Sequence, residues 1–251
     1  MKTGAFIIAR LGSTRLPAKN LLPILGKPMI QHLYERVRQS KEVDIMALAT
    51  STDPSDDPLC TFANDIGIPF HRGSLHDVMD RVASAAEAFG CDTIIEILGD
   101  NPLVHADLID DTVDLFRKQN LDYAASLTTE YPNVDESLKR FPLGIRVQVY
   151  RRDVAWQWRV FPDFYESGQG TSAYIFCNPD RFKCGYLDAS GKWLALNKPE
   201  LNFAVNYQKN FNLIEKIFAK FYPHDKNFSL NKVMEFVQSQ PECATLMRGE
   251  P

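Results

Sequence analysis

Near its start the chain reads Gly4-Ala5-Phe6-Ile7-Ile8-Ala9-Arg10-Leu11-Gly12-Ser13-Thr14-Arg15-Leu16-Pro17-Ala18-Lys19. Residues 4–9 form an apolar run of strand length, which stops abruptly at Arg10. The loop that follows carries three cations, two hydroxyls, a glycine and a proline. In α/β proteins, a buried strand that leads into such a loop commonly presents backbone N–H groups and positive charge to a phosphate. An ordinary strand followed by a solvated basic turn remains the alternative interpretation of this stretch alone.

The pattern of strand, loop and helix recurs along the first half of the chain. Further apolar strands are expected at residues 44–50, 93–98 and 122–127, and amphipathic helices at 30–40, 59–66, 77–89 and 106–119. Near-continuous apolar strands that alternate with helices predict a mostly parallel α/β sheet covered on both faces. We therefore expect the ligand site at the carboxyl ends of the strands, where the loops that begin at Arg10, Thr50 and Gly99 should converge.

The second half of the chain is less regular. Its apolar pattern predicts strands at residues 144–150 and 202–206, an extended segment at 182–187, and helices at 153–160, 211–221 and 230–237. The sequence contains no internal repeat and no low-complexity linker. A single domain over residues 1–251, with a small extension of the sheet, is the simplest interpretation.

Composition and charge exclude several classes of protein. The hydrophobic fraction of 45% and the charged fraction of 24% are ordinary for a soluble globular protein. A net charge of −4 argues against non-specific nucleic-acid binding. The five cysteines include no CxxC pair, which argues against a zinc site or a disulfide framework. No apolar run approaches the ~18–20 residues of a membrane span, and no signal peptide is seen, so we expect a cytoplasmic protein.

Three cations on one loop at the end of a strand suit a nucleoside triphosphate as the ligand. Each charge-assisted contact can contribute ~1.5–3 kcal/mol. Arg10 and Arg15 can fork onto phosphate oxygens, and Lys19 can act as a point charge. Asp100 follows a buried strand and Gly99, where it can hold Mg²⁺ against the same phosphates. A capping or turn aspartate is the alternative interpretation of Asp100.

Four motifs carry a resemblance to a known family: Ala9-Arg10-x-x-Ser13-Thr14-Arg15-Leu16-Pro17-x-Lys19, Leu25-Gly26-Lys27-Pro28-Met29, Arg72-Gly73-Ser74-x-x-Asp77-Val78-x-Asp80-Arg81 and Gly99-Asp100-x-Pro102-Leu103. Together they resemble the CMP-sugar synthetases, which include the CMP-Kdo and CMP-acylneuraminate synthetases. Within that group the chain is most similar to the CMP-Kdo synthetases and to the cytidylyltransferases of spore coat polysaccharide biosynthesis. The resemblance covers residues 4–127 and continues more weakly to about Ile217.

The resemblance implies a Rossmann-like nucleotide-diphospho-sugar transferase fold and an enzyme that transfers CMP from CTP to an acidic or sugar-like acceptor. Pyrophosphate is released, Mg²⁺ is the expected cofactor, and the product would serve cell-surface polysaccharide or lipopolysaccharide assembly. Residues 1–127 would form the nucleotide-binding half, and residues 128–251 the acceptor and dimerisation half of a homodimer.

The resemblance also assigns residues to roles. The catalytic residues would be Arg10, Lys19 and Asp100. Residues that bind the nucleotide would be Ala9, Arg10, Leu11, Gly12, Ser13, Arg15, Lys19, Thr50, Ser51, Arg72, Ser74 and Asp77. Of these, Thr50 and Ser51 lie where the family reads the cytosine edge, with Arg72 and Ser74 beside them. A surface position in a turn is the alternative for Arg72.

The second half departs from the family pattern. A metal-binding aspartate of the family is replaced by Asn206, so the expected metal ligands are Asp100 and Asn206, of which the second brings no charge. Three acids of the family's acceptor strand are replaced by Leu143, Arg146 and Gln148. A Glu-His pair is replaced by Gln169-Gly170. Acceptor binding would then fall to Arg146, Gln148 and Gln169.

Two explanations of these departures compete. The acceptor site could have changed to receive a more anionic acceptor, with Arg146 as a bidentate clamp for a carboxylate or phosphate. Alternatively, metal binding could be impaired in a non-catalytic, nucleotide-binding relative that regulates or scaffolds a partner. A nucleotidyltransferase that uses another NTP is a third hypothesis, and Arg146 could also be a salt-bridged residue of the sheet.

Overall fold

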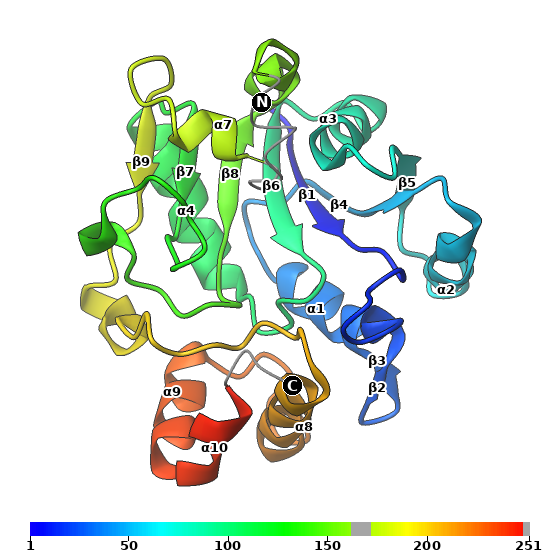
Figure 1. The fold of residues 1–251 in the computed structure, drawn as a ribbon, viewed down its shortest axis with the longest axis vertical. Coiled ribbons are helices and arrows are strands. Elements are labelled where there is room, and N and C mark those ends of the chain that lie inside the picture. Colours follow the sequence, from blue (N-terminus) through cyan, green and yellow to red (C-terminus); the bar gives the residue numbers. More distant parts are fainter. Residues whose placement is uncertain (162–171, 248–251) are drawn as a thin grey trace.

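A twisted sheet runs through the middle of the molecule (Figure 1). The computed structural model describes residues 1–161 and 172–247. Within them the sheet has seven strands in the order β5-β4-β1-β6-β8-β7-β9. The strands are β1 (Thr3–Ile8), β4 (Ile45–Ser51), β5 (Phe70–Gly73), β6 (Thr93–Leu98), β7 (Tyr123–Ala125), β8 (Gln148–Arg151) and β9 (Cys184–Tyr186). A separate hairpin pairs β2 (Pro23–Ile24) with β3 (Lys27–Pro28).

The pairing of the strands confirms the predicted α/β class. Strands β5, β4, β1 and β6 are mutually parallel, as their apolar sequences and intervening helices require. Strand β8 pairs antiparallel with β6 and β7, and β9 is parallel to β7. The first strand therefore lies inside the sheet between β4 and β6, so the loops that leave β1, β4 and β6 emerge at one edge.

Helices cover both faces of the sheet. Helices α1 (Met29–Val37), α2 (Asp57–Asp65) and α4 (Ala106–Lys118) contribute to one buried cluster, and α3 (Val78–Ala88), α5 (Arg152–Ala155) and α7 (Ala173–Phe176) to the other. Helices α8 (Gln208–Phe221), α9 (Leu230–Ser239) and α10 (Pro241–Leu246) lie together at one end of the molecule (Figure 1). Short 3₁₀ turns are η1 (Lys19–Leu21), η2 (Pro54–Asp56), η3 (Glu136–Leu138), η4 (Trp156–Val160) and η5 (Gly191–Leu196). No helix among the described residues could span a membrane.

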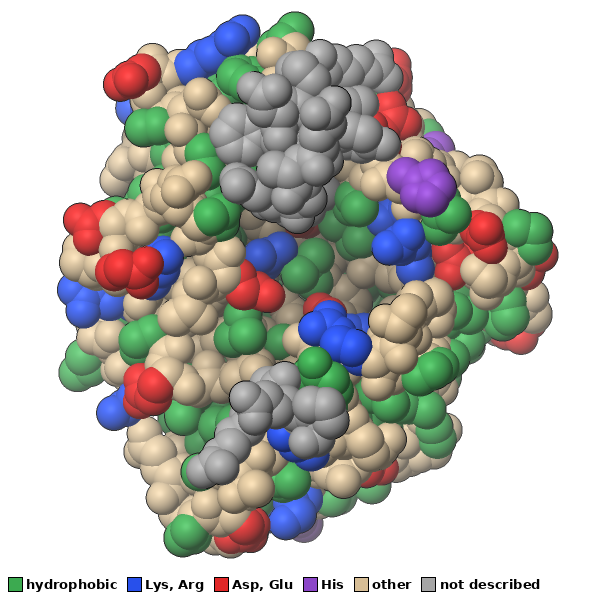
Figure 2. All heavy atoms as spheres, viewed as in Figure 1, with side chains coloured by type: hydrophobic (Ala, Val, Ile, Leu, Met, Phe, Trp, Pro, Cys, Tyr) green, Lys and Arg blue, Asp and Glu red, His purple; other side chains and the backbone are tan. Residues whose placement is uncertain are grey.

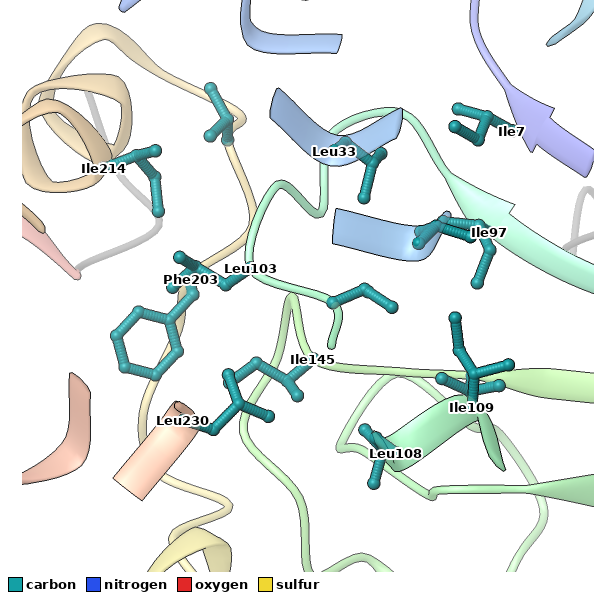
Figure 3. Packing of buried hydrophobic residues seen from close by; sticks show 14 of the residues in the cluster. Ile7, Leu33, Ile97, Leu103, Leu108, Ile109, Ile145, Phe203, Ile214 and Leu230 are labelled. Atoms are coloured by element: carbon teal, nitrogen blue, oxygen red, sulfur yellow. The ribbon is translucent and has the colours of Figure 1, made fainter. Parts of the chain in front are cut away.

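Alternate residues of each central strand face opposite clusters. In β1, Ile7 belongs to the cluster with α1 and α4, and Phe6 to the cluster with α3. This is the period of two that a strand buried on both faces requires. The larger cluster extends beyond the sheet to the C-terminal helices through Phe203, Ile214 and Leu230 (Figure 3). Burial of each such side chain contributes about 1.5–3 kcal/mol, so the C-terminal helices are held by the core that supports the sheet.

The prediction of a strand at residues 202–206 is wrong. This segment forms one isolated bridge, between Leu143 and Asn202, and otherwise runs as irregular chain beside the loop that precedes β8. The predicted strand at 144–150 is likewise shorter, since β8 begins at Gln148. Gly144 precedes β8, adopts φ +86° and turns the chain there. A Cβ at this position would lie 2.3 Å from the backbone nitrogen of Ala204, so the turn packs directly on the backbone of residues 203–204.

This close approach yields a testable expectation. Gly144→Ala should destabilise the fold, because it combines a positive φ with a collision against backbone atoms that cannot move aside. Gly191→Ala is the matched control, since Gly191 also has a positive φ (54°) but has open space around its Cβ position. We expect Gly144→Ala to lower the free energy of unfolding by at least ~1 kcal/mol more than the control. Urea denaturation of both variants measures the difference, and equal values would contradict the packing argument.

Candidate active site

A cavity of about 680 Å³ opens at the carboxyl ends of β1 and β6. Its lining combines the loop after β1, the start of α3, the loop after β6 and residues of the second half. Figure 2 shows this face hollowed near its centre, with basic and acidic side chains around the hollow. The lining residues are Ile8, Ala9, Arg10, Gly12, Ser13, Arg15, Lys19, Asn20, Val78, Arg81, Leu98, Gly99, Asp100, Glu130, Tyr131, Pro132, Arg146, Gln148, Ser172, Ala173 and Phe176.

Lys19 connects three segments at the floor of this cavity. Its ammonium donates to Asp100 Oδ2 at 2.8 Å and to the carbonyl oxygen of Val205 at 2.7 Å. Lys19 is only 8% exposed, so its charge depends on these two partners. Gly99 permits the approach, because a Cβ there would lie 2.9 Å from the carbonyl oxygen of Ile8. The loops that begin at Arg10 and Gly99, which were predicted to converge, thus meet through Lys19 and Asp100.

Both arginines of the loop also line the cavity. Arg10 donates from Nη1 to the carbonyl oxygen of Leu75 at 2.8 Å. Arg15 donates to Asn206 Oδ1 at 2.8 Å, and its guanidinium lies 5.6 Å from the ring centre of Tyr207. These contacts leave other guanidinium N–H groups for a ligand, since each arginine carries five. The cations that the sequence places on one loop therefore converge on one cavity.

The loop after β4 supports this arrangement from the side. Asp56 accepts hydrogen bonds from the backbone of Leu11 at 2.7 Å and from the hydroxyl of Ser51. Thr50 and Ser51 are fully buried and line neither this cavity nor a smaller one beside it. The smaller cavity, of about 210 Å³, is lined by Arg10, Gly12, Asp53, Ser55, Asp56 and Leu75. Asp56 thus joins two segments: it binds the hydroxyl of Ser51 at the end of β4 and the backbone N–H of Leu11 in the loop after β1.

The predicted residues at positions 72–77 hold loops together. Arg72 donates to the carbonyl oxygens of Ser51 at 2.9 Å and Asp53 at 3.0 Å, and it pairs with Asp57 at 2.8 Å. Ser74 accepts from the backbone N–H of Asp77 at 3.0 Å. Asp77 caps α3 by accepting from the backbone N–H of Asp80 at 2.8 Å. None of Arg72, Ser74 and Asp77 lines the main cavity, so their roles in nucleotide binding stay predictions.

Arg146 lines the same cavity between two carboxylates. It pairs with Glu130 at 3.3 Å and with Glu96 at 3.8 Å, and it stands 5.5 Å from the ring centre of Tyr131. Although burial opposes the charge, Tyr131, Glu130 and Glu96 together hold the pKa of Arg146 above its usual value. The predicted acceptor residue therefore lines the cavity, but its charge is already balanced by protein groups.

Gln148 belongs to a buried hydrogen-bond network behind Arg146. Its amide donates to Glu96 Oε1 at 2.8 Å, and its carbonyl oxygen accepts from the hydroxyls of Tyr123 and Ser172. Glu96 also accepts from the hydroxyl of Tyr150 at 2.6 Å. Both polar atoms of the Gln148 side chain are thus satisfied within the protein. Gln169, the third predicted acceptor residue, lies outside the described residues.

Several lining residues have no role in the sequence-based prediction, and among them are the polar side chains of Arg81, Glu130 and Tyr131. Arg81 lies within a motif that resembles the family, so its type and spacing were visible. Nothing in the sequence marked Glu130-Tyr131, because these residues lie in the irregular segment that follows β7 (Tyr123–Ala125). Burial raises the pKa of Tyr131 to about 12, which keeps its hydroxyl protonated at neutral pH.

Comparison with known proteins shows which family the chain belongs to. The family model for Cytidylyltransferase matches residues 5–147, which is more than half of the chain and includes every lining residue of the first half. The chain belongs to the cytidylyltransferase family. The prediction of a nucleotidyltransferase enzyme is thereby confirmed.

Relatives of this cytidylyltransferase include proteins that match over nearly its whole length. The spore coat polysaccharide biosynthesis protein SpsF of Bacillus subtilis is 28% identical, with 96% of each chain covered. An uncharacterized protein of Methanocaldococcus jannaschii is 29% identical over 98% of this chain and 94% of its own. The 3-deoxy-manno-octulosonate cytidylyltransferase 2 of Hydrogenovibrio crunogenus is 34% identical over 51% of this chain and 52% of its own.

Two solved structures share the fold of this cytidylyltransferase. A cytidylyltransferase from Leptospira borgpetersenii superposes with a TM-score of 0.84 at 21% identity and covers 100% of this chain and 98% of its own. CMP:2-keto-3-deoxy-manno-octonic acid synthetase, complexed with CTP, superposes with a TM-score of 0.63 at 21% identity, over 88% and 99% of the two chains. At these identities the likeness bears on the fold alone, and it confirms the predicted Rossmann-like fold.

The cavity floor offers few ligands for a metal ion. Among the described residues, no group of three or more His, Cys, Asp or Glu side chains could hold one. Asp100 supplies a carboxylate, and Val205, whose backbone N–H donates to the carbonyl oxygen of Asp100 at 2.9 Å, places Asn206 nearby. Mg²⁺ in nucleotide sites is commonly held by one or two carboxylates, waters and substrate phosphates. The residues present therefore fit a Mg²⁺ that arrives with a triphosphate, and they do not form a complete site of their own.

The contacts of Lys19 predict a loss of phosphate binding in Lys19→Met. This change removes one buried cation and leaves Asp100 to repel a polyphosphate. We expect tripolyphosphate to bind about tenfold to a hundredfold more weakly, measured by titration calorimetry, because one charge-assisted contact contributes ~1.5–3 kcal/mol. Lys27→Met is the matched control, since Lys27 pairs with Glu35 and does not line the cavity. If both variants bind tripolyphosphate with equal affinity, Lys19 does not contact the polyphosphate.

Proposed function

We propose that this enzyme transfers CMP from CTP to an acidic sugar or sugar-like acceptor and releases pyrophosphate. The observation that carries the proposal is the cavity at the ends of β1 and β6, where Arg10, Arg15 and Lys19 face Asp100. Membership of the cytidylyltransferase family supports the choice of CTP. The names of the relatives support an acidic sugar, since one is a 3-deoxy-manno-octulosonate cytidylyltransferase and another acts in spore coat polysaccharide biosynthesis.

The loop after β1 would bind the triphosphate. Arg10 and Arg15 can each fork onto phosphate oxygens, and the backbone of Gly12 and Ser13 borders the same space. Arg15 is oriented by Asn206 and Arg10 by the carbonyl oxygen of Leu75. Because these guanidinium groups are held before the ligand arrives, less conformational entropy is lost on binding.

The reaction forms one bond at the α-phosphorus and breaks another. A hydroxyl oxygen of the acceptor attacks the α-phosphorus and releases its proton to solvent, the bond from the α-phosphorus to the oxygen that bridges to the β-phosphate breaks, and pyrophosphate leaves with the negative charge. The cations of the loop after β1 stabilise that charge as it develops, and Lys19 keeps the carboxylate of Asp100 in place. Mg²⁺, held by Asp100 and Asn206 together with phosphate oxygens, would supply further positive charge and orient the phosphates.

The second half would bind the acceptor. Arg146, Glu130 and Gln148 all border the same cavity as the loop after β1, and Arg146 pairs with Glu130. An acceptor carboxylate at Arg146 would have to share the guanidinium with Glu130, whereas acceptor hydroxyls could donate to the Glu130 carboxylate. We therefore propose an acceptor with both a carboxylate and several hydroxyls. The homodimer, the cytoplasmic location and the role in cell-surface polysaccharide assembly stay predictions.

An assay of pyrophosphate release tests the proposed function. Purified protein with CTP and Mg²⁺ should release pyrophosphate when one member of a panel of ulosonic acids and sugar phosphates is added. Calorimetry with the four NTPs should show the tightest binding for CTP. Binding of CTP without pyrophosphate release for any acceptor would favour the non-catalytic alternative, and tighter binding of another NTP would overturn the choice of nucleotide.

The neutral side chain of Asn206 gives a further prediction. Asn206→Asp should tighten Mg²⁺ binding in the presence of CTP, because it adds a carboxylate near Asp100. The matched control is Gln208→Glu, which adds the same charge two residues away on an exposed side chain that donates to Asn212. Titration of Mg²⁺ against pyrophosphate release or CTP binding measures the effect. If both variants behave as the native protein does, Asn206 takes no part in metal binding.

A further inference from the structure

Arg81 is a buried cation with unused hydrogen-bond donors. The residue is 0% exposed and lines the main cavity from the first turn of α3. Its Nη1 donates to the carbonyl oxygen of Ser74 at 2.7 Å, whereas Nε and Nη2 have no hydrogen-bond partner among the described residues. Buried guanidinium groups are rarely left in this state, because each unsatisfied donor costs the free energy of its desolvation.

Close packing against β5 and a capped helix start hold Arg81 in this position. Helix α3 packs so closely on β5 that a Cβ at Gly73 would lie 2.9 Å from Arg81 Cγ and 3.0 Å from its Cα. Asp77 caps the helix one turn before Arg81. Ser74, which accepts from Arg81, and Leu75, which accepts from Arg10, are consecutive residues of one loop. The same loop therefore anchors two arginines that border the cavity.

A second buried arginine, Arg36, has hydrogen-bond partners on all sides and serves as a comparison for Arg81. Arg36 is 1% exposed and donates to the carbonyl oxygens of Leu103, Val104 and Phe228. Its guanidinium also lies 4.3 Å from the ring centre of Phe228. Arg81 has the same burial without this set of partners. Burial, with the nearby charge of Arg10, lowers the pKa of Arg81 to about 10, so it remains charged at neutral pH.

We propose that Arg81 binds an oxyanion of a substrate through Nε and Nη2, the edge of the guanidinium that has no partner in the protein. This edge presents two parallel N–H groups, which match two oxygens of a phosphate or a carboxylate. The inference rests on the proposed function for its ligands, and two of these have the required chemistry. One is a phosphate of CTP, which Arg10 would share, and the other is the carboxylate of the acceptor.

Calorimetry on Arg81→Lys and Arg81→Gln distinguishes these sources. The probes are CTP with Mg²⁺, tripolyphosphate, and an ulosonic acid that the native protein binds. A phosphate at Arg81 should make CTP and tripolyphosphate bind about tenfold to a hundredfold more weakly, and Arg81→Lys should recover little because an ammonium offers no fork. A carboxylate at Arg81 should leave CTP affinity unchanged and weaken the acid by a similar factor, with a raised KM for the acceptor.

Controls separate a loss of ligand from a loss of fold. Arg36→Lys should lower the thermal unfolding midpoint, as any substitution of a buried arginine does, and leave CTP affinity unchanged. In the native protein, the Nε–H resonance of Arg81 should shift in nitrogen-15 NMR spectra when CTP or the acid is added, which tests the proposal where a variant does not fold.

The proposal is overturned if folded Arg81 variants bind every probe as the native protein does and the resonance does not shift. This outcome is distinct from a failure of the proposed function, in which the native protein binds CTP but releases no pyrophosphate with any acceptor.

Discussion

The contact between the Lys19 ammonium, the Asp100 carboxylate and the Val205 carbonyl is the interaction on which the site depends. It joins segments that are 81 and 186 residues apart in the sequence. The carbonyl oxygen of Asp100 accepts from Val205 in turn, so the irregular segment before α8 is fixed against the end of β6. Because Lys19 is nearly buried, the pairing is costly to break, and the first and second halves of the chain are held in one relative position.

The two walls of the cavity differ in their electrostatic balance. On the nucleotide wall, Arg10 and Arg15 are oriented by neutral oxygen atoms, so their positive charge remains for a ligand. On the other wall, Arg146 is paired with Glu96 and Glu130, and that wall carries little net positive charge. Gln148 donates to the same Glu96, so the charge of Arg146 is embedded in a network that supplies its own acids. An anionic ligand at Arg146 would therefore have to compete with Glu96 and Glu130.

The sequence was most informative where structure is local. The apolar runs located β1, β4 and β6 to within a residue or two, and the loops after β1 and β6 meet as predicted, through Lys19 and Asp100. The strand prediction failed at residues 202–206, where an apolar stretch runs as irregular chain against the turn at Gly144. Sequence reasoning also assigned no role to Arg81, since burial and a missing partner depend on how α3 packs against Gly73. Such properties arise from tertiary contacts, which residue spacing does not encode.

Recognition of the base is where the structure most changes the interpretation of the first half. Thr50 and Ser51, which the resemblance places at the cytosine edge, are both buried, and the hydroxyl of Ser51 donates to Asp56. The loop after β4 borders the smaller cavity beside Arg10 through Asp53, Ser55 and Asp56. Arg72 holds that loop through the carbonyl oxygens of Ser51 and Asp53. Ser51, through Asp56, and Arg72 therefore hold the loop that borders this smaller cavity, although neither side chain lines it.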